Sequence, residues 1–183
     1  MARLLALMNA AIADSCMVAW YDKYGHDFWR PVTAIREAGI DDNPDTQPDP
    51  AFTPLGSPAT NQPGKPNFTP PFPSYPSGHA VLGSAAFAIL RSFYGTDQIA
   101  FTFVSDELNG ISRDNQGNVR PLWPRSFASL TEAEQDNGVS RIYLGVHFRF
   151  DVENGMTLGR QVGNYVFKRG LVQPGSCGCG GGQ

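Results

Sequence analysis

Apolar and small residues recur at spacings of three and four near both ends of the chain. A helix over residues 2–22, either amphipathic or largely buried, is predicted by Leu4, Leu5, Met8, Ala11, Ile12, Ser15 and Val18 or Ala19. A second helix, from Asp151 to about Val172, is predicted with the buried face Met156, Leu158, Val162, Val166 and Phe167. The Ala-rich run 80–93 predicts a third helix. The chain is therefore expected to be mainly α.

The segments between these helices carry few regular patterns. Residues 39–75 are dominated by Pro, Asp, Asn, Thr and Gly, which predicts a long loop. Residues 99–105 alternate as an edge strand does, and the turn-rich residues 106–127 are compatible with a small β-hairpin. Ser129 or Thr131, with Glu132 and Glu134, is typical of a capped helix start.

Composition is that of one globular domain. The chain has 183 residues, 41% of them hydrophobic, which is enough for one core. We expect a single helical domain over residues 1–174, followed by a flexible Gly/Cys tail at 175–183. With 14 Lys and Arg against 17 Asp and Glu, the net charge of -3 disfavours nucleic acid and anionic membranes as partners. Any anion site must therefore be built locally.

The N-terminal sequence and the cysteines do not indicate in which cellular compartment the protein resides. Cys16, Cys177 and Cys179 suit neither a disulfide framework nor a four-ligand zinc site. No apolar run approaches the roughly 20 residues that span a bilayer, so no transmembrane segment is expected. Residues 1–13 superficially resemble a secretory signal, but the apolar pattern continues to Trp20, which favours a structural helix.

The stretch from Pro73 to His79, Pro-Ser-Tyr-Pro-Ser-Gly-His, predicts an oxyanion site. Its prolines force an extended approach to the Ala-rich run, so Ser77, Gly78 and His79 should open a helix. A helix start offers free N–H groups and a positive dipole end to an anion. Ser77 adds a hydroxyl, Gly78 permits close approach, and His79 can transfer a proton near neutral pH.

Two cations lie in an aromatic setting before the long loop. Lys23 and Arg30 are seven residues apart, so on one helix they would lie within about 20° of each other. Pro31 indicates that this helix ends at Arg30. Either cation alone is better interpreted as a solvated side chain, but the flanking aromatics disfavour that interpretation here.

A third group of polar residues surrounds the second informative histidine. His147 and Asp151 are four apart, so on a helix the carboxylate could fix the tautomer of the imidazole. Arg141 is six residues before His147 and reaches the same ligand only if it stretches or if the helix breaks near Gly145. A satisfied core histidine is the plainer interpretation of His147. His26 is expected at the surface.

Together these stretches resemble the shared signature of vanadium-dependent haloperoxidases and acid phosphatases of the type 2 phosphatidic acid phosphatase superfamily. The resemblance rests on three motifs: Lys23 with Arg30-Pro31, Pro76-Ser-Gly-His79, and Ser140-Arg141 with His147 and Asp151. It implies a helical bundle with long Pro-rich loops that holds the oxyanion between helices. It also implies vanadate as cofactor.

The resemblance implies a role for each matched residue. Lys23, Arg30 and Arg141 would neutralise the oxygens of vanadate or phosphate, and Ser77 with the Gly78 N–H would complete the cradle. His147 would bond vanadium, or attack phosphorus in a phosphatase, and His79 would be the acid or base. Asp151 would support His147.

The residues that flank the three motifs favour a haloperoxidase over a phosphatase. Phe72 and Trp20 fall where haloperoxidases of the chloride-oxidising type carry aromatics beside the halide. The expected reaction oxidises chloride or bromide with hydrogen peroxide to hypohalous acid, which then meets a small organic acceptor. The alternative is hydrolysis of a phosphomonoester in the same pocket, and the third is an oxyanion-binding domain without turnover.

The main departure from the family is length. Its haloperoxidases are much longer, and the portion that usually precedes the Lys segment is missing here. We therefore expect either a piece of a longer protein or a chain that covers its apolar helical faces by forming a homo-oligomer.

Overall fold

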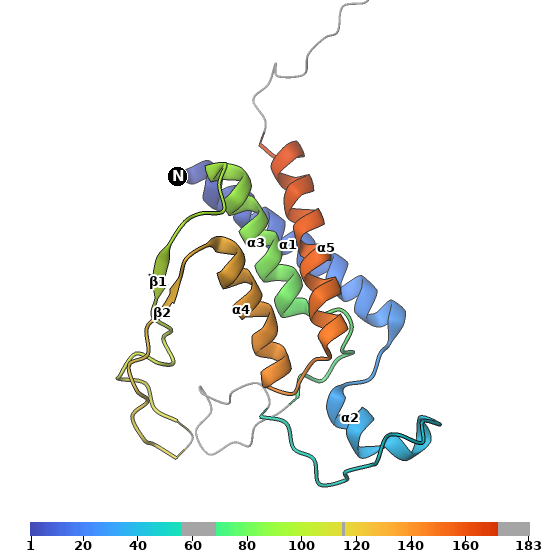
Figure 1. Cartoon of the computed structure of the whole chain (residues 1–183). Helices are drawn as coiled ribbons and strands as arrows, with labels where there is room; N and C mark the ends of the chain where they lie inside the picture. Colours follow the sequence, from blue (N-terminus) through green and yellow to red (C-terminus); the bar gives the residue numbers. More distant parts are fainter. Residues whose placement is uncertain (56–68, 115, 172–183) are drawn as a thin grey trace, which may run out of the picture.

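The computed structural model describes residues 1–55, 69–114 and 116–171. The long helices are α1 (Ala2–His26), α3 (Gly78–Tyr94), α4 (Leu130–Tyr143) and α5 (Arg149–Arg169). The short elements are helix α2 (Pro31–Arg36), the 3-10 turn Ala38–Ile40 and strands β1 (Phe101–Phe103) and β2 (Arg125–Phe127). Figure 1 shows α4, α3 and α5 side by side and α1 crossing behind them, with the strands at one flank and α2 beyond the end of the bundle. The predicted helical bundle is confirmed.

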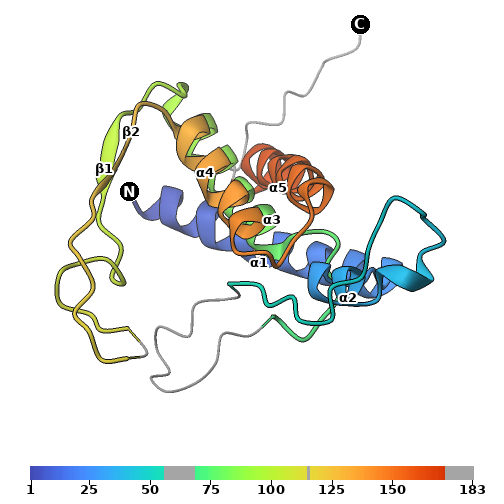
Figure 2. The same cartoon turned by 60° about the horizontal axis from the view of Figure 1, so that its bottom comes forward.

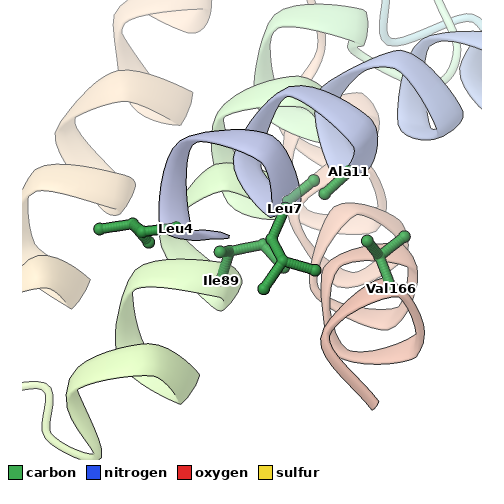
Figure 3. Packing of buried hydrophobic residues seen from close by; sticks show 6 residues of the cluster. Leu4, Leu7, Ala11, Ile89 and Val166 are labelled. Carbon is green, nitrogen blue, oxygen red and sulfur yellow. The ribbon is translucent and has the colours of Figure 1, made fainter. Parts of the chain in front are cut away.

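Helix α3 is the centre of the bundle, because it packs against α1, α4 and α5. Figure 2 shows α4 on one side of α3 and α1 on the other. The hydrophobic core lies where α1, α3 and α5 meet, and its buried residues are Leu4, Leu7, Ala11, Ala85, Ile89 and Val166 (Figure 3). The core thus fixes α3, whose N-terminus opens the predicted oxyanion site.

The contact between α3 and α5 is made by glycine rather than by large apolar side chains. Gly155, Gly159 and Gly163 are buried at a spacing of four on α5. A Cβ on Gly159 would lie 2.2 Å from the Val81 carbonyl oxygen of α3. The predicted buried face was therefore right for Val166, whereas Met156, Leu158, Val162 and Phe167 are only partly buried. An apolar pattern cannot reveal a face made by backbone approach.

Helix α1 buries a narrow stripe of residues. The stripe consists of Leu4, Leu7, Ala11, Ser15, Ala19 and Lys23, whereas Leu5, predicted in the buried face, is 53% exposed. By length and composition the segment Ala2–Arg36 could cross a membrane, with a mean hydropathy of 1.4 in its best window. Its N-terminal turns, however, form part of the bundle core, as expected of a structural helix. Self-association through the exposed apolar side chains of α1 stays a prediction.

Helix α1 ends four residues earlier than Pro31 suggested. Asp27 adopts a left-handed conformation (φ 47°) and its N–H caps the Lys23 carbonyl, so the helix stops at His26. Arg30 is extended and precedes α2, which was not predicted. Lys23 and Arg30 therefore do not share a helical face, and the expectation that they do was wrong.

The remaining elements follow the sequence pattern closely. Strands β1 and β2 pair antiparallel, with Phe101 opposite Phe127, and close the turn-rich segment into a hairpin. Ser129 caps α4 by accepting a hydrogen bond from the Glu132 N–H at 3.1 Å. The predicted loop 39–75 begins after the 3-10 turn, and its residues 56–68 lie outside the described residues, as does the predicted tail at 175–183.

Candidate active site

The N-terminus of α3 is one wall of the site. Ser77 caps the helix, with its hydroxyl accepting from the Ala80 N–H at 3.4 Å. The Ser77 N–H donates to the Asp151 carbonyl at 2.9 Å, which ties this turn to the start of α5. A Cβ on Gly78 would lie 3.0 Å from the Trp20 ring and 3.6 Å from the Lys23 side chain. Glycine at 78 therefore leaves room for Trp20 and Lys23 against the backbone.

Lys23 reaches this wall from α1 and is fully buried. Its Nζ donates to the carbonyls of Pro73 at 2.8 Å, Ser74 at 2.9 Å and Pro76 at 2.6 Å. These bonds use all three ammonium donors. Lys23 thus braces the 73–76 loop in this structure, and a bond to an anion would exchange one of these partners. Burial lowers the pKa of Lys23 to about 7, with Arg30 adding to the effect.

Arg30 is buried and joins three segments of the site. Its guanidinium donates to the Phe72 carbonyl at 2.9 Å, to the Val146 carbonyl at 2.8 Å and to Nε2 of His147 at 3.1 Å. Burial lowers the pKa of Arg30 to about 10, and it remains charged at neutral pH.

His147 is buried and its tautomer follows from its contacts. Because arginine only donates, Nε2 of His147 accepts from Arg30, so the ring proton is on Nδ1. Nδ1 lies 3.0 Å from Oδ2 of Asp151, which accepts that proton and a further bond from the Ser74 hydroxyl. Burial lowers the pKa of His147 to about 4, with Asp151 opposing the shift. The imidazole is therefore neutral at neutral pH.

The predicted helical pairing of His147 with Asp151 needs a correction. Helix α4 ends at Tyr143, and Gly145 takes a left-handed φ of 72°. His147 precedes α5, while Asp151 lies in its first turn and accepts from the Phe148 N–H at 3.0 Å. The two side chains meet across a helix start rather than along a helix. The break at Gly145 is one of the two alternatives that the Arg141 to His147 spacing left open.

Arg141 and His79 form the side of the site nearest α4. His79 lies in the first turn of α3 and is exposed, yet the protein around its ring and the charge of Arg141 lower its pKa. Burial also lowers the pKa of Arg141. The positive charge of Arg141 contributes to the lowered pKa of Arg30. Arg141 therefore lies within electrostatic range of both Arg30 and His79.

The charges of this cluster are strongly unbalanced. Each of Lys23, Arg30 and Arg141 is partly or fully buried, and Asp151 is the carboxylate that raises the pKa of Lys23 and Arg30. Over the described ranges there is no group of three His, Cys, Asp or Glu residues that could hold a metal cation. Three cations gathered around one carboxylate favour an anion as the ligand of this cluster.

Aromatic rings close the side of the cluster next to α1. Trp20 and Phe72 pack with ring centroids 5.2 Å apart. Lys23 Nζ lies 5.2 Å, and Arg30 Cζ 5.0 Å, from the centre of the Phe72 ring. The structure thus brings together the two aromatics predicted beside the halide and places them against two of the predicted cations.

Sequence reasoning missed two polar contributors to the site. Ser74 bonds to Asp151 from inside the Pro-rich motif, where nothing in its spacing singles it out. The carbonyls of the 73–76 loop, which take the Lys23 donors, carry no sequence signal at all. Backbone acceptors become visible only once the chain is folded.

Comparison with known proteins shows the family of this chain. The family described as the VCPO second helical-bundle domain matches residues 3–173. The chain belongs to this family. It is similar to the vanadium chloroperoxidase of Curvularia inaequalis, with 41% identity over 174 residues, 82% of this chain and 28% of that protein.

Solved structures point the same way. A bacterial vanadium-dependent iodoperoxidase is 31% identical, covers 90% of this chain and 32% of its own, and has a TM-score of 0.64. A bacterial vanadium-dependent chloroperoxidase in its holo form shares the fold with a TM-score of 0.66 at 20% identity, over 88% of this chain and 34% of its own. This member of the VCPO family therefore spans about a third of the length of these relatives.

Proposed function

We propose that this chain binds vanadate and uses it to oxidise chloride or bromide with hydrogen peroxide. The observation that carries the proposal is the cluster of buried Lys23 and Arg30 with half-buried Arg141, in which Arg30 donates to the neutral imidazole of His147. Family membership and the names of the relatives, which are vanadium haloperoxidases, support the same choice.

The residues present fit a vanadate ion. Lys23, Arg30 and Arg141 would neutralise its oxygens, and two of them offer planar guanidinium forks. Ser77 and the Gly78 N–H would add donors at the start of α3, where the helix dipole favours negative charge. Nε2 of His147 carries the lone pair that would bond vanadium. Bound vanadate would act as a Lewis acid that activates peroxide.

The protein side chains would supply charge, order and proton transfer. Asp151 holds the proton of His147 on Nδ1 and so leaves the Nε2 lone pair unprotonated. Arg30 donates to that lone pair in this structure and would give up this bond to a ligand. His79, at the exposed side of the cluster, is the group suited to take up a proton and pass it to a leaving hydroxide, because an imidazole gives and takes protons near neutral pH. Trp20 and Phe72 would shield a halide from water beside the cations.

Acid phosphatase activity is the second candidate, because Nε2 of His147 is equally suited to attack a phosphoryl group. Its lone pair lies among the same cations that would stabilise the transferring group. The two chemistries differ in what the pocket holds. Phosphate hydrolysis needs no vanadate, whereas halide oxidation does.

One pair of assays tests the proposal. Halogenation of a diketone acceptor is measured with peroxide and either bromide or chloride, with and without added vanadate. Hydrolysis of a chromogenic phosphomonoester is measured beside it. We expect halogenation that depends on vanadate and is abolished in His147→Ala. The control His26→Gln, which changes an exposed histidine outside the cluster, should keep it. Phosphomonoester hydrolysis without halogenation would assign the phosphatase, and silence in both assays would favour an oxyanion-binding domain.

A further inference from the structure

Helix α4 presents an asparagine to the backbone of His79. Nδ2 of Asn137 donates to the His79 carbonyl oxygen at 3.4 Å. The same amide lies directly on Gly83, one turn further along α3, because a Cβ on Gly83 would be only 2.3 Å from Nδ2. The Asn137 side chain therefore lies against two points of α3 one turn apart, the His79 carbonyl and Gly83.

The orientation of the amide leaves its oxygen for the imidazole. Nδ2 faces the carbonyl and Gly83, so Oδ1 remains as the acceptor. Burial and the charge of Arg141 lower the pKa of His79, and hydrogen bonding by the Asn137 side chain opposes that shift. An acceptor for a ring N–H stabilises the protonated ring, which agrees with the sign of this Asn137 effect.

Asn137 and Arg141 are one turn apart on α4, so they lie on the same face of the helix. Arg141 is the charged group that disfavours a proton on His79, and Asn137 is the neutral group that favours one. One helix face thus carries two opposing influences on the same imidazole.

We propose that Asn137 is the positioning residue of His79: its amide accepts from the imidazole N–H and fixes the ring at the start of α3. The proposal rests on the proton-transfer role proposed for His79. It goes beyond that role, because it names the group that sets the orientation and the protonation of the ring. Gly83 is part of this arrangement, because the Asn137 amide can approach α3 this closely only where residue 83 has no Cβ.

Imidazole NMR of the full chain without vanadate tests this directly. The three histidines are titrated in phosphate-free buffer, and His79 is assigned by its loss in His79→Gln. Asn137→Ala should lower the pKa of His79 by about half a unit, and Asn137→Asp should raise it by about one unit. Asn164→Ala, at an exposed position of α5, is the matched control and should leave it unchanged. A His79 pKa that is the same in wild type, Asn137→Ala and Asn137→Asp would overturn the proposal.

A second variant moves the amide without removing it. Gly83→Ala places a methyl group where Nδ2 lies, so the Asn137 side chain must swing away, and alanine favours the helix. We expect the pKa of His79 to fall as it does in Asn137→Ala. A folded Gly83→Ala protein with the wild-type His79 pKa would contradict the proposal. Because these titrations need no vanadate and no halide, their outcome is independent of the halogenation assay.

Discussion

Oδ2 of Asp151 lies 3.0 Å from Nδ1 of His147, and the two residues meet at the start of α5 rather than within a helix. The same oxygen accepts from the Phe148 N–H and from the Ser74 hydroxyl. Asp151 therefore orients the histidine, caps the helix and anchors the Pro-rich loop at once. The consequences of losing it should appear in both ligand binding and stability.

Replacing Asp151 with asparagine should weaken vanadate binding. The amide of the Asp151→Asn variant could donate toward Nδ1 of His147, which would favour the wrong tautomer and place the ring proton on Nε2. Loss of such a supporting partner weakens a ligated ion by about 10–100-fold. Titration calorimetry with vanadate measures the change, with Glu153→Gln on the exposed face of α5 as the control. Equal affinities of Asp151→Asn and wild type would argue against the orienting role.

Stability should fall in mild acid because of His147. Its folded pKa is about 4, whereas an unfolded histidine titrates near its ordinary value of 6.5. Between these pH values the unfolded chain binds more protons, so the free energy of unfolding decreases as pH falls through that window and is unaffected by this group above it. Urea midpoints measured across the window should fall less steeply in His147→Gln than in wild type. Parallel pH profiles would show that His147 does not carry the effect.

A buried carboxylate away from the site should matter for folding. Glu134 of α4 is fully buried and pairs with Arg91 of α3 at 2.7 Å and Arg160 of α5 at 2.8 Å. Breaking a buried ion pair by removing one partner costs about 3–5 kcal/mol, so Glu134→Gln should lower the urea midpoint clearly. The control Asp136→Asn breaks the exposed pair with Arg125 and should cost at most about 1 kcal/mol. Similar losses in the two variants would contradict this account.

The glycine contact between α3 and α5 makes a sharper packing prediction. Gly159→Ala forces a methyl group into the Val81 carbonyl, and overpacking of this kind destabilises by about 1–3 kcal/mol. Gly25→Ala on α1 meets no atom within 4 Å and should instead stabilise by up to about 1 kcal/mol. Chemical denaturation of both variants checks the pair. A Gly159→Ala protein as stable as wild type would contradict this prediction, because α3 and α5 would then admit the methyl group at no cost in stability.

Local sequence patterns predicted where helices begin better than they predicted where α1 ends or how α3 and α5 pack. Ser77 and Ser129 predicted the starts of α3 and α4, because an N-cap hydroxyl accepts from an N–H only three residues later in the chain. The early end of α1 escaped prediction because it depends on a left-handed Asp27, a conformation that asparagine and aspartate adopt without a fixed sequence signal. The packing of Gly159 on Val81 escaped because periodicity counts apolar side chains, not backbone contacts.

Most charged side chains of the site could also be predicted from the sequence. The motifs supplied the cations, the two histidines and Asp151, and the structure brings them together around Arg30 and the start of α3. What remained hidden were contacts made by main-chain carbonyls and by Asn137, 58 residues from His79 in the chain. Such partners follow from tertiary packing, which no local spacing encodes.

Vanadate binding is the most direct test of the central claim that the buried cations and His147 form an oxyanion site. The affinity of the full chain for vanadate is measured by calorimetry for wild type, His147→Ala, His79→Ala and the surface variant His26→Gln. We predict that His147→Ala abolishes binding, whereas His79→Ala and His26→Gln retain it. Equal loss of vanadate in His147→Ala and His79→Ala, or no binding by the wild-type chain, would contradict the account.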